Sequence, residues 1–271
     1  MIADKYRLIK LLGEGGAGKT YEAEEIATKQ RVAIKAIALR HVKDWKVVEL
    51  FKREAKVLAN LQHPAIPKYI DYVCEDTLGD RYFYLVRELV SGDSLFDLVR
   101  QGWKPDKKEV QEIARQVLDI LQYLHKQKPS VIHRDIKPQN LIKDESGKAF
   151  LVDFGSLTEA YHQIFGNSTF VGTLGYMPPE QLRGDVSFAM DLYSLGATLL
   201  FLLTKQNPED IPQQRMKLNF KSQVNVSERF ANWLDKMLEP IAEDRFQSVA
   251  EALTVLNSKI NFLSRLVAKL F

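Results

Sequence analysis

The chain of 271 residues is 45% apolar and 27% charged, which is ordinary for a soluble globular protein with one large domain or two lobes. Its formal net charge of +3 is spread along the chain without a run of Lys or Arg, which favours a solvated surface and argues against a nucleic-acid partner. The single cysteine, Cys74, excludes an internal disulfide and the N-terminus carries no signal-peptide pattern, so we expect a cytoplasmic protein.

The first ninety residues predict an antiparallel sheet with one helix inserted. Short segments rich in aliphatic and β-favouring residues are separated by glycine-rich or polar turns. These predicted strands are residues 6–12, 19–25, 31–38, 70–74 and 82–89. Between the third and fourth of them, residues 45–61 carry apolar side chains at steps of three and four, which predicts a helix with one buried stripe.

From residue 94 onward the pattern is mainly helical. Asp106 followed by Glu109 resembles a capping box, and the apolar stripe from Val110 to Leu124 predicts a long helix after it. A turn-rich segment follows, and helices resume near Asp191. We expect Asp191 to be a helix N-cap that also braces the preceding loop.

Residues 13–20 form a glycine-rich segment, Gly-Glu-Gly-Gly-Ala-Gly-Lys-Thr, that satisfies two phosphate-binding patterns at once. One is the P-loop, G-x-x-x-x-G-K-T, which must open directly into a helix. The other is the G-x-G-x-x-G hairpin, whose backbone lies over ATP. The residues that follow read as a hairpin, although propensity alone leaves a helix over residues 19–29 open, and a glycine-rich turn without a ligand is a third reading.

Four further motifs follow this segment. Val-Ala-Ile-Lys ends at Lys35, and His-Arg-Asp-Ile-Lys-Pro-Gln-Asn covers residues 133–140. Asp-Phe-Gly covers residues 153–155, and Gly-Thr-Leu-Gly-Tyr-Met-Pro-Pro-Glu covers residues 172–180. The ordered set resembles the eukaryotic-type protein kinases, in particular a bacterial serine/threonine kinase catalytic domain, over about residues 6–257.

The resemblance implies an α+β fold with two lobes and ATP in the cleft between them. The N-lobe is an antiparallel β-sheet plus one helix, and the C-lobe is mainly α-helical. Because the sequence pattern changes from strand-like to mainly helical at residues 90–93, we expect an ATP-binding N-lobe over 1–90 and a catalytic, substrate-binding C-lobe over 91–257. We expect residues 258–271 to form a C-terminal amphipathic helical extension, for which packing on its own lobe is favoured over contact with a partner or a membrane surface.

Phosphoryl transfer requires several negative charges to be held in line and neutralised, and the resemblance assigns four catalytic residues to this task. Lys35 supplies a cation for the α- and β-phosphates and pairs with Glu54 on the buried flank of the predicted helix. Asp135 accepts the proton of the acceptor hydroxyl or orients it. Lys137 stabilises the charge of the transferred group.

The resemblance also implies a metal site and an ATP site. Asn140 and Asp153 offer oxygen ligands suited to Mg²⁺, and Mn²⁺ is an alternative. The ATP site consists of the glycine-rich hairpin, the strand that ends at Lys35 and the inter-lobe hinge. The residues expected there are Gly13, Glu14, Gly15, Gly16, Ala17, Gly18, Thr20, Ala33, Lys35, Glu88 and Val90.

The class of substrate follows from two positions. Lys137 lies two residues after the catalytic aspartate, and Thr173, which we expect near Asp135 and Lys137, precedes Tyr176. Both features are typical of the Ser/Thr subgroup. The implied reaction moves the γ-phosphate of Mg-ATP to Ser or Thr hydroxyls of proteins, including the kinase itself, in bacterial signalling.

Arg87 departs from the family pattern, which has an apolar or uncharged residue just before Glu88. Burying a guanidinium group without a charged partner costs a large amount of folding free energy. We expect Arg87 to reach Glu54 or Asp153, or to turn to solvent. If it captured Glu54, it would compete with Lys35 and hold the enzyme inactive.

Arg134 is typical of kinases that are switched on when a phosphate on the activation segment neutralises this arginine. Thr158, Ser168 and Thr169 are candidate acceptors. The residues directly after Gly155 contain no second Lys or Arg, so the sequence leaves a requirement for phosphorylation open.

For three further residues within the range of the resemblance, we expect a structural role. His133 is expected to brace the loop without a catalytic role, and Glu180 and Arg245 to form a buried ion pair. Two alternatives to a working kinase remain. One is a pseudokinase that serves as a binding scaffold, which Arg87 alone supports. The other is a P-loop nucleotide hydrolase, which leaves the motifs from 133 to 180 unexplained.

Overall fold

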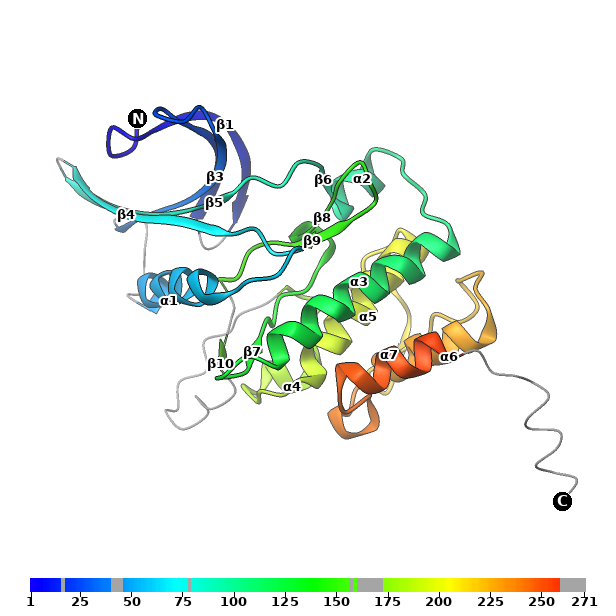
Figure 1. Cartoon of the computed structure of the whole chain (residues 1–271). Coiled ribbons are helices and arrows are strands. Elements are labelled where there is room, and N and C mark those ends of the chain that lie inside the picture. The colour runs from blue at the N-terminus through cyan, green and yellow to red at the C-terminus, as the bar shows by residue number, and fades with distance from the viewer. Residues whose placement is uncertain (16–17, 40–45, 78, 156–157, 160–172, 259–271) are drawn as a thin grey trace, which may run out of the picture.

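The computed structural model describes residues 1–15, 18–39, 46–77, 79–155, 158–159 and 173–258. Figure 1 shows a curved sheet that lies beside a mainly helical part, with α1 packed below the sheet. The helices are α1 (Lys46–Asn60), α2 (Leu95–Arg100), α3 (Lys107–His125), α4 (Pro179–Leu182), α5 (Ala189–Thr204), α6 (Glu228–Met237) and α7 (Val249–Asn257). The strands are β1 (Tyr6–Gly15), β2 (Gly18–Glu25), β3 (Arg31–Ala38), β4 (Tyr69–Thr77), β5 (Asp80–Glu88), β6 (Asp93–Ser94), β7 (Val131–Ile132), β8 (Leu141–Lys143), β9 (Ala149–Leu151), β10 (Thr158–Glu159), β11 (Gln213–Gln214) and β12 (Lys217–Leu218).

The large sheet has the strand order β1-β2-β3-β5-β4, and its neighbouring strands are antiparallel. All five predicted strands are confirmed. Gly18 at the start of β2 has a φ of +120°, and a Cβ atom there would lie 2.2 Å from the carbonyl oxygen of Ala36, so only glycine fits. Since β2 is a strand, the helical reading of residues 19–29 is wrong, and the P-loop alternative lacks the helix that it needs.

Helix α1 confirms the helix expected between the third and fourth strands. Its apolar stripe of Val48, Phe51, Ala55 and Leu58 is buried against the sheet and the helical part. Glu54 lies on the same flank and is only 3% exposed. A carboxylate at this depth requires a partner that carries positive charge.

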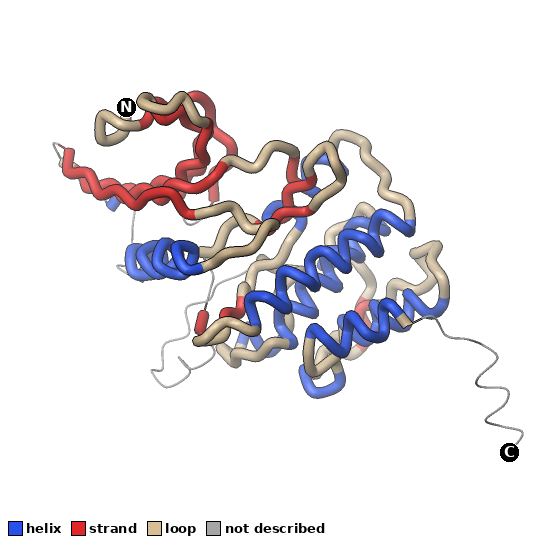
Figure 2. The backbone as a smooth tube through the Cα atoms, viewed as in Figure 1, coloured by secondary structure: helices blue, strands red, loops and turns tan. Residues whose placement is uncertain are grey.

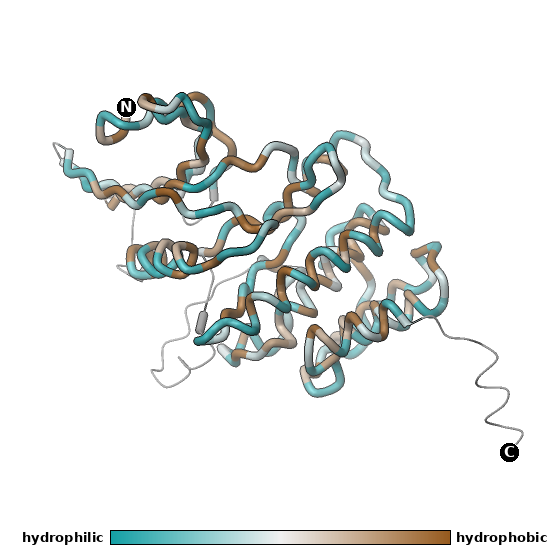
Figure 3. Tube along the Cα trace, in the orientation of Figure 1, coloured by the Kyte–Doolittle hydropathy of each residue, from teal (hydrophilic) through white to brown (hydrophobic). Residues whose placement is uncertain are grey.

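The helical part is built around α3 and α5. The capping box of α3 is present, since the Asp106 carboxylate accepts from the amides of Lys108 and Glu109 and the Glu109 side chain accepts from the Asp106 amide. Apolar and polar residues alternate along α3, as Figure 3 shows, and its apolar stripe is buried. Helix α5 is buried from Ala189 to Leu202, because it is apolar on nearly every side and lies at the centre of the core.

Short strands flank the loops that lie between the large sheet and the helices (Figure 2). Strand β7 pairs with β10, and β8 pairs with both β6 and β9. The loop between β7 and β8 contains residues 133–140, and residues 153–155 follow β9. Both motifs therefore emerge next to each other, below α1 and the large sheet.

The last described helix, α7, has Ser248 as its N-cap and buries Leu256. The helical extension predicted from residue 258 lies outside the described residues beyond Ser258 and stays a prediction. Within the described part of the chain, none of the helices has the length and apolar character needed to cross a bilayer.

Candidate active site

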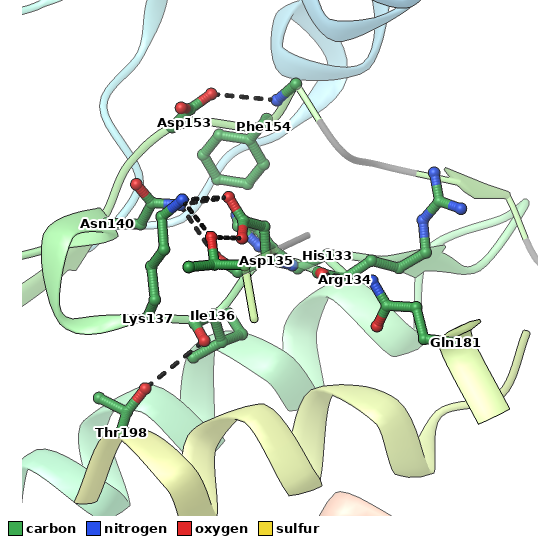
Figure 4. Close-up of polar contacts among 12 residues, drawn as sticks. His133, Arg134, Asp135, Ile136, Lys137, Asn140, Asp153, Phe154, Gln181 and Thr198 are labelled. Atoms are coloured by element: carbon green, nitrogen blue, oxygen red, sulfur yellow. Dashed lines mark hydrogen bonds and ion pairs between the residues drawn. The ribbon is translucent and has the colours of Figure 1, made fainter. Parts of the chain in front are cut away.

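Three side chains hold the carboxylate of Asp135 in place (Figure 4). Asn140 Nδ2 donates to Oδ2 at 3.0 Å, and Lys137 Nζ lies 2.9 Å from the same oxygen. Thr173 Oγ1 donates to Oδ1 at 3.0 Å and accepts from Lys137 Nζ at 2.8 Å. The expected approach of Thr173 to Asp135 and Lys137 is therefore confirmed, and the loop is joined to the segment before α4.

Asp191 anchors this loop from below. Its fully buried carboxylate accepts from the amides of His133 at 3.0 Å and Arg134 at 2.8 Å, and it lies 2.9 Å from Nε2 of His125. The predicted brace is confirmed, but the N-cap assignment is wrong. Asp191 is the third residue of α5, and Phe188 occupies the N-cap position without a side-chain hydrogen bond.

His133 supports the loop by packing. The imidazole is fully buried and meets the ring of Phe154 edge-on, with a centroid distance of 5.1 Å. Burial lowers the pKa of His133, so the ring is neutral at physiological pH. A neutral ring enclosed by the core agrees with the structural reading of this residue.

Lys35 lies between two carboxylates that come from different parts of the chain. Its Nζ is 2.9 Å from Glu54 Oε2 and 2.6 Å from Asp153 Oδ1. The second oxygen of Glu54 accepts from the amide of Phe154 at 3.1 Å. A Cβ atom at Gly155 would lie 2.9 Å from Lys35 Nζ, so glycine at this position leaves room for the cluster.

The charged groups of this cluster shift one another's pKa. Burial alone would lower the pKa of Lys35, but the charges of Asp153 and Glu54 outweigh it and raise that pKa above its usual value. Burial raises the pKa of Glu54, and Lys35 opposes the shift. Desolvation would raise the pKa of Asp153, but the charge and hydrogen bond of Lys35 lower it below its usual range. Asp153 is therefore a carboxylate at neutral pH.

Asn140 and Asp153 present a donor set that fits a hard divalent cation. The amide nitrogen of Asn140 is engaged with Asp135, which leaves its carbonyl oxygen to face Asp153 (Figure 4). Only Oδ1 of Asp153 takes part in the hydrogen bonds of the described residues. Within the described ranges there is no group of three or more His, Cys, Asp or Glu side chains that could hold a metal ion by itself. Mg²⁺ needs no such group, because it keeps waters and binds substrate phosphates.

The residues expected around ATP are placed as follows. In the β1–β2 hairpin, Glu14 pairs with Lys19, while Gly16 and Ala17 at the tip lie outside the described residues. Ala33 is buried on β3, two residues before Lys35. The side chain of Glu88 accepts from the amide of Lys68 at 3.2 Å, and the amide of Glu88 donates to the carbonyl oxygen of Lys68 at 2.9 Å.

Arg87 has not turned to solvent, because it is only 8% exposed. Nor does it displace Lys35, which keeps its bond to Glu54. The charges of Asp153 and Glu54 act on the guanidinium, although burial has the larger effect and lowers the pKa of Arg87. The alternative that Arg87 turns to solvent is therefore wrong, and so is the hypothesis that it takes Glu54 from Lys35. Both carboxylates act on Arg87 through their charge, and among the described residues it forms no hydrogen bond with either.

A second arginine, Arg53 on α1, lies close to Arg134 and was missed in the sequence. Burial, together with the positive charge of Arg53, lowers the pKa of Arg134 to about 10. Nη2 of Arg53 is buried without a hydrogen-bond partner among the described residues. No local pattern predicts this contact, because the two residues lie in different lobes.

Replacing Arg53 with methionine is expected to stabilise the protein by about 0.5–1 kcal/mol, because it removes the repulsion between two guanidinium groups. Sulfate, compared with chloride of equal ionic strength, should raise the Tm of the wild type more than that of Arg53→Met, since this anion can bridge two arginines. Thermal unfolding measures both effects. An equal response of the two proteins to sulfate would contradict the prediction.

The fold and the site define a protein kinase domain, and known proteins agree. The family model described as protein kinase domain matches residues 6–258, so this chain belongs to the protein kinase domain family. It is similar to Serine/threonine-protein kinase B of Synechocystis sp., with 36% identity over 270 residues, which covers 93% of this chain and 46% of that protein. Serine/threonine-protein kinase PknA of Nostoc sp. is 33% identical over 273 residues, covering 94% of this chain and 47% of that protein.

A further relative comes from Bacillus subtilis. Serine/threonine-protein kinase PrkC of Bacillus subtilis is 32% identical over 211 residues, which covers 77% of this chain and 32% of that protein. The chain thus spans about half the length, or less, of these relatives. The resemblance to a eukaryotic-type bacterial Ser/Thr kinase catalytic domain and the two-lobed fold are confirmed.

Proposed function

We propose that this chain is an active kinase domain that transfers the γ-phosphate of Mg-ATP to Ser or Thr hydroxyls of proteins. The observation that carries the proposal is the carboxylate of Asp135, held by Asn140, Lys137 and Thr173 within 3.0 Å. A carboxylate fixed in this way beside an ammonium group can receive a proton while the ammonium neutralises phosphate charge.

The step follows from the roles of the residues. Asp135 accepts the proton of the acceptor hydroxyl. The oxygen of that hydroxyl bonds to the γ-phosphorus, and the bond from this phosphorus to the leaving oxygen of ADP breaks. Lys137 stabilises the charge on the transferred group. Lys35, oriented by Glu54, holds the α- and β-phosphates so that the leaving oxygen stays in line. Asn140 and Asp153 would hold the divalent cation, Mg²⁺ or Mn²⁺, which would supply positive charge against the phosphates when bound.

The ATP site in this proposal consists of the residues expected from the sequence, and the lobe limits are 1–90 and 91–257. The acceptor class is Ser or Thr, which the bond between Lys137 and Thr173 supports. The compartment is the cytoplasm, because Cys74 is a free cysteine and a kinase needs ATP. Protein substrates, including the chain itself, are the proposed acceptors.

A pseudokinase scaffold is the second candidate, and the burial of Arg87 is the observation that favours it. Against it stands the intact bond between Lys35 and Glu54 at 2.9 Å, because the cation for the phosphates is already in position. The filled positions at Asp135 and Asp153 also favour catalysis. The kinase reading explains more of the site.

Transfer of label from ATP in the presence of Mg²⁺ tests the proposal, with the chain itself and a generic basic protein as acceptors. We expect label on Ser or Thr in the wild type and background levels in Asp135→Ala. Asp119→Ala, which changes an exposed aspartate of α3, is the matched control and should keep wild-type transfer. A wild type that binds Mg-ATP without transferring phosphate would support the scaffold instead.

A further inference from the structure

Arg87 and Lys35 lie on one face of the large sheet. In the antiparallel pair of β3 and β5, Ala33 is opposite Arg87 and Lys35 is opposite Leu85. Residues that are directly opposite point to the same side, so Lys35 and Arg87 are diagonal neighbours on that side, typically about 7–8 Å apart. This is the side on which Glu54 and Asp153 meet Lys35. Two cations from the sheet therefore face two carboxylates that come from elsewhere in the chain.

When Glu54 and Asp153 are both ionised, the charges in this cluster balance only with Arg87 included. Lys35 forms the direct bonds to both Glu54 and Asp153, so one ammonium serves two carboxylates and leaves one negative charge over. Arg87 is buried on the same side of the sheet as these groups. Within the described part of the chain, Arg87 donates no hydrogen bond to either carboxylate. Its contribution to the cluster is therefore its charge rather than a fixed bond.

We propose that Arg87 is a positioning residue that sets how strongly Asp153 takes up a divalent cation, by supplying the second fixed positive charge beside Glu54 and Asp153. The inference rests on the proposed function, in which Asp153 is a metal ligand. An incoming cation is repelled by Arg87 as well as by Lys35. Uptake then depends on the phosphates of the nucleotide, whose negative charge offsets this repulsion. Arg87 thereby couples metal uptake to ATP binding.

The half-saturating Mg²⁺ concentration for binding of a fluorescent, non-hydrolysable ATP analogue tests this inference without catalysis. Arg87→Met removes the charge but keeps a long unbranched side chain, and Arg87→Lys keeps the charge. We expect Arg87→Met to lower the half-saturating concentration about three- to tenfold and Arg87→Lys to stay within about twofold of the wild type. An unchanged value in Arg87→Met, or equal shifts in both variants, would overturn the inference, since equal shifts indicate shape rather than charge.

A double-mutant cycle on urea unfolding, without metal or nucleotide, tests the charge coupling separately. Arg87→Met should shift the unfolding midpoint differently in the wild-type background and in Asp153→Asn, because the partner charge is absent from the second. Additive shifts would overturn the inference. If the wild type bound no nucleotide, the proposed kinase activity would be contradicted, while the cycle would still decide whether Arg87 and Asp153 are coupled.

Discussion

Replacing Lys35 with methionine is expected to lower kcat/KM for ATP by about 10²- to 10³-fold, the loss typical of removing one preorganised electrostatic group. The side chain of Lys35 is 7% exposed, and its ammonium group lies within 2.9 Å of both Glu54 and Asp153. In the proposed mechanism it also holds the α- and β-phosphates in line. Methionine keeps the length of the side chain but removes the charge on which each of these interactions depends.

Steady-state kinetics with ATP as the varied substrate measures this effect, and thermal unfolding of the same samples separates it from loss of fold. Lys10→Met is the matched control, because Lys10 is an exposed lysine of the same sheet, paired with Glu22 at 3.3 Å. Its kcat/KM should equal that of the wild type, since exposed ion pairs contribute little. A folded Lys35→Met protein with kcat/KM close to the control would show that Lys35 does not position the phosphates.

Much of the fold could be predicted because it depends on local patterns. The five strands of the large sheet and helix α1 follow from the spacing of apolar residues, and the capping box at Asp106 and Glu109 was visible as a pair three residues apart. Asp191 shows where this reasoning fails. An aspartate that precedes an apolar run looks like an N-cap, but α5 begins two residues earlier and the carboxylate binds the amides of a distant loop instead.

The site residues were predictable where a motif carries them, and their mutual contacts were not. The pairing of Lys35 with Glu54 was expected, but its shorter bond to Asp153 joins residues 118 positions apart, which no local pattern reveals. The same holds for Arg53, which meets Arg134 only because α1 packs above the loop after β7. Arg87 was recognised as unusual, yet its surroundings depend on strand register and on two carboxylates from other elements.

Replacing Glu180 with glutamine is expected to lower the free energy of unfolding of the helical lobe by about 3–5 kcal/mol, because it leaves a buried guanidinium without its counter-charge. Arg245 is 1% exposed, and its Nη2 lies 2.8 Å from Glu180 Oε2. The same guanidinium donates to the carbonyl oxygens of Glu239, Ala189 and Pro240. These neutral acceptors satisfy its hydrogen bonds but cannot balance its charge.

Urea unfolding followed by tryptophan fluorescence, to which Trp233 buried in the helical lobe contributes, measures this loss. Asp185→Asn is the matched control, because its pair with Arg183 at 3.3 Å is exposed and should contribute no more than about 1 kcal/mol. The double variant Glu180→Gln/Arg245→Met should lose less stability than the two single variants together, because neither charge is left alone. A loss in Glu180→Gln no larger than that in Asp185→Asn would mean that the hydrogen bonds of Arg245, rather than its charge pairing, hold the two ends of the lobe together.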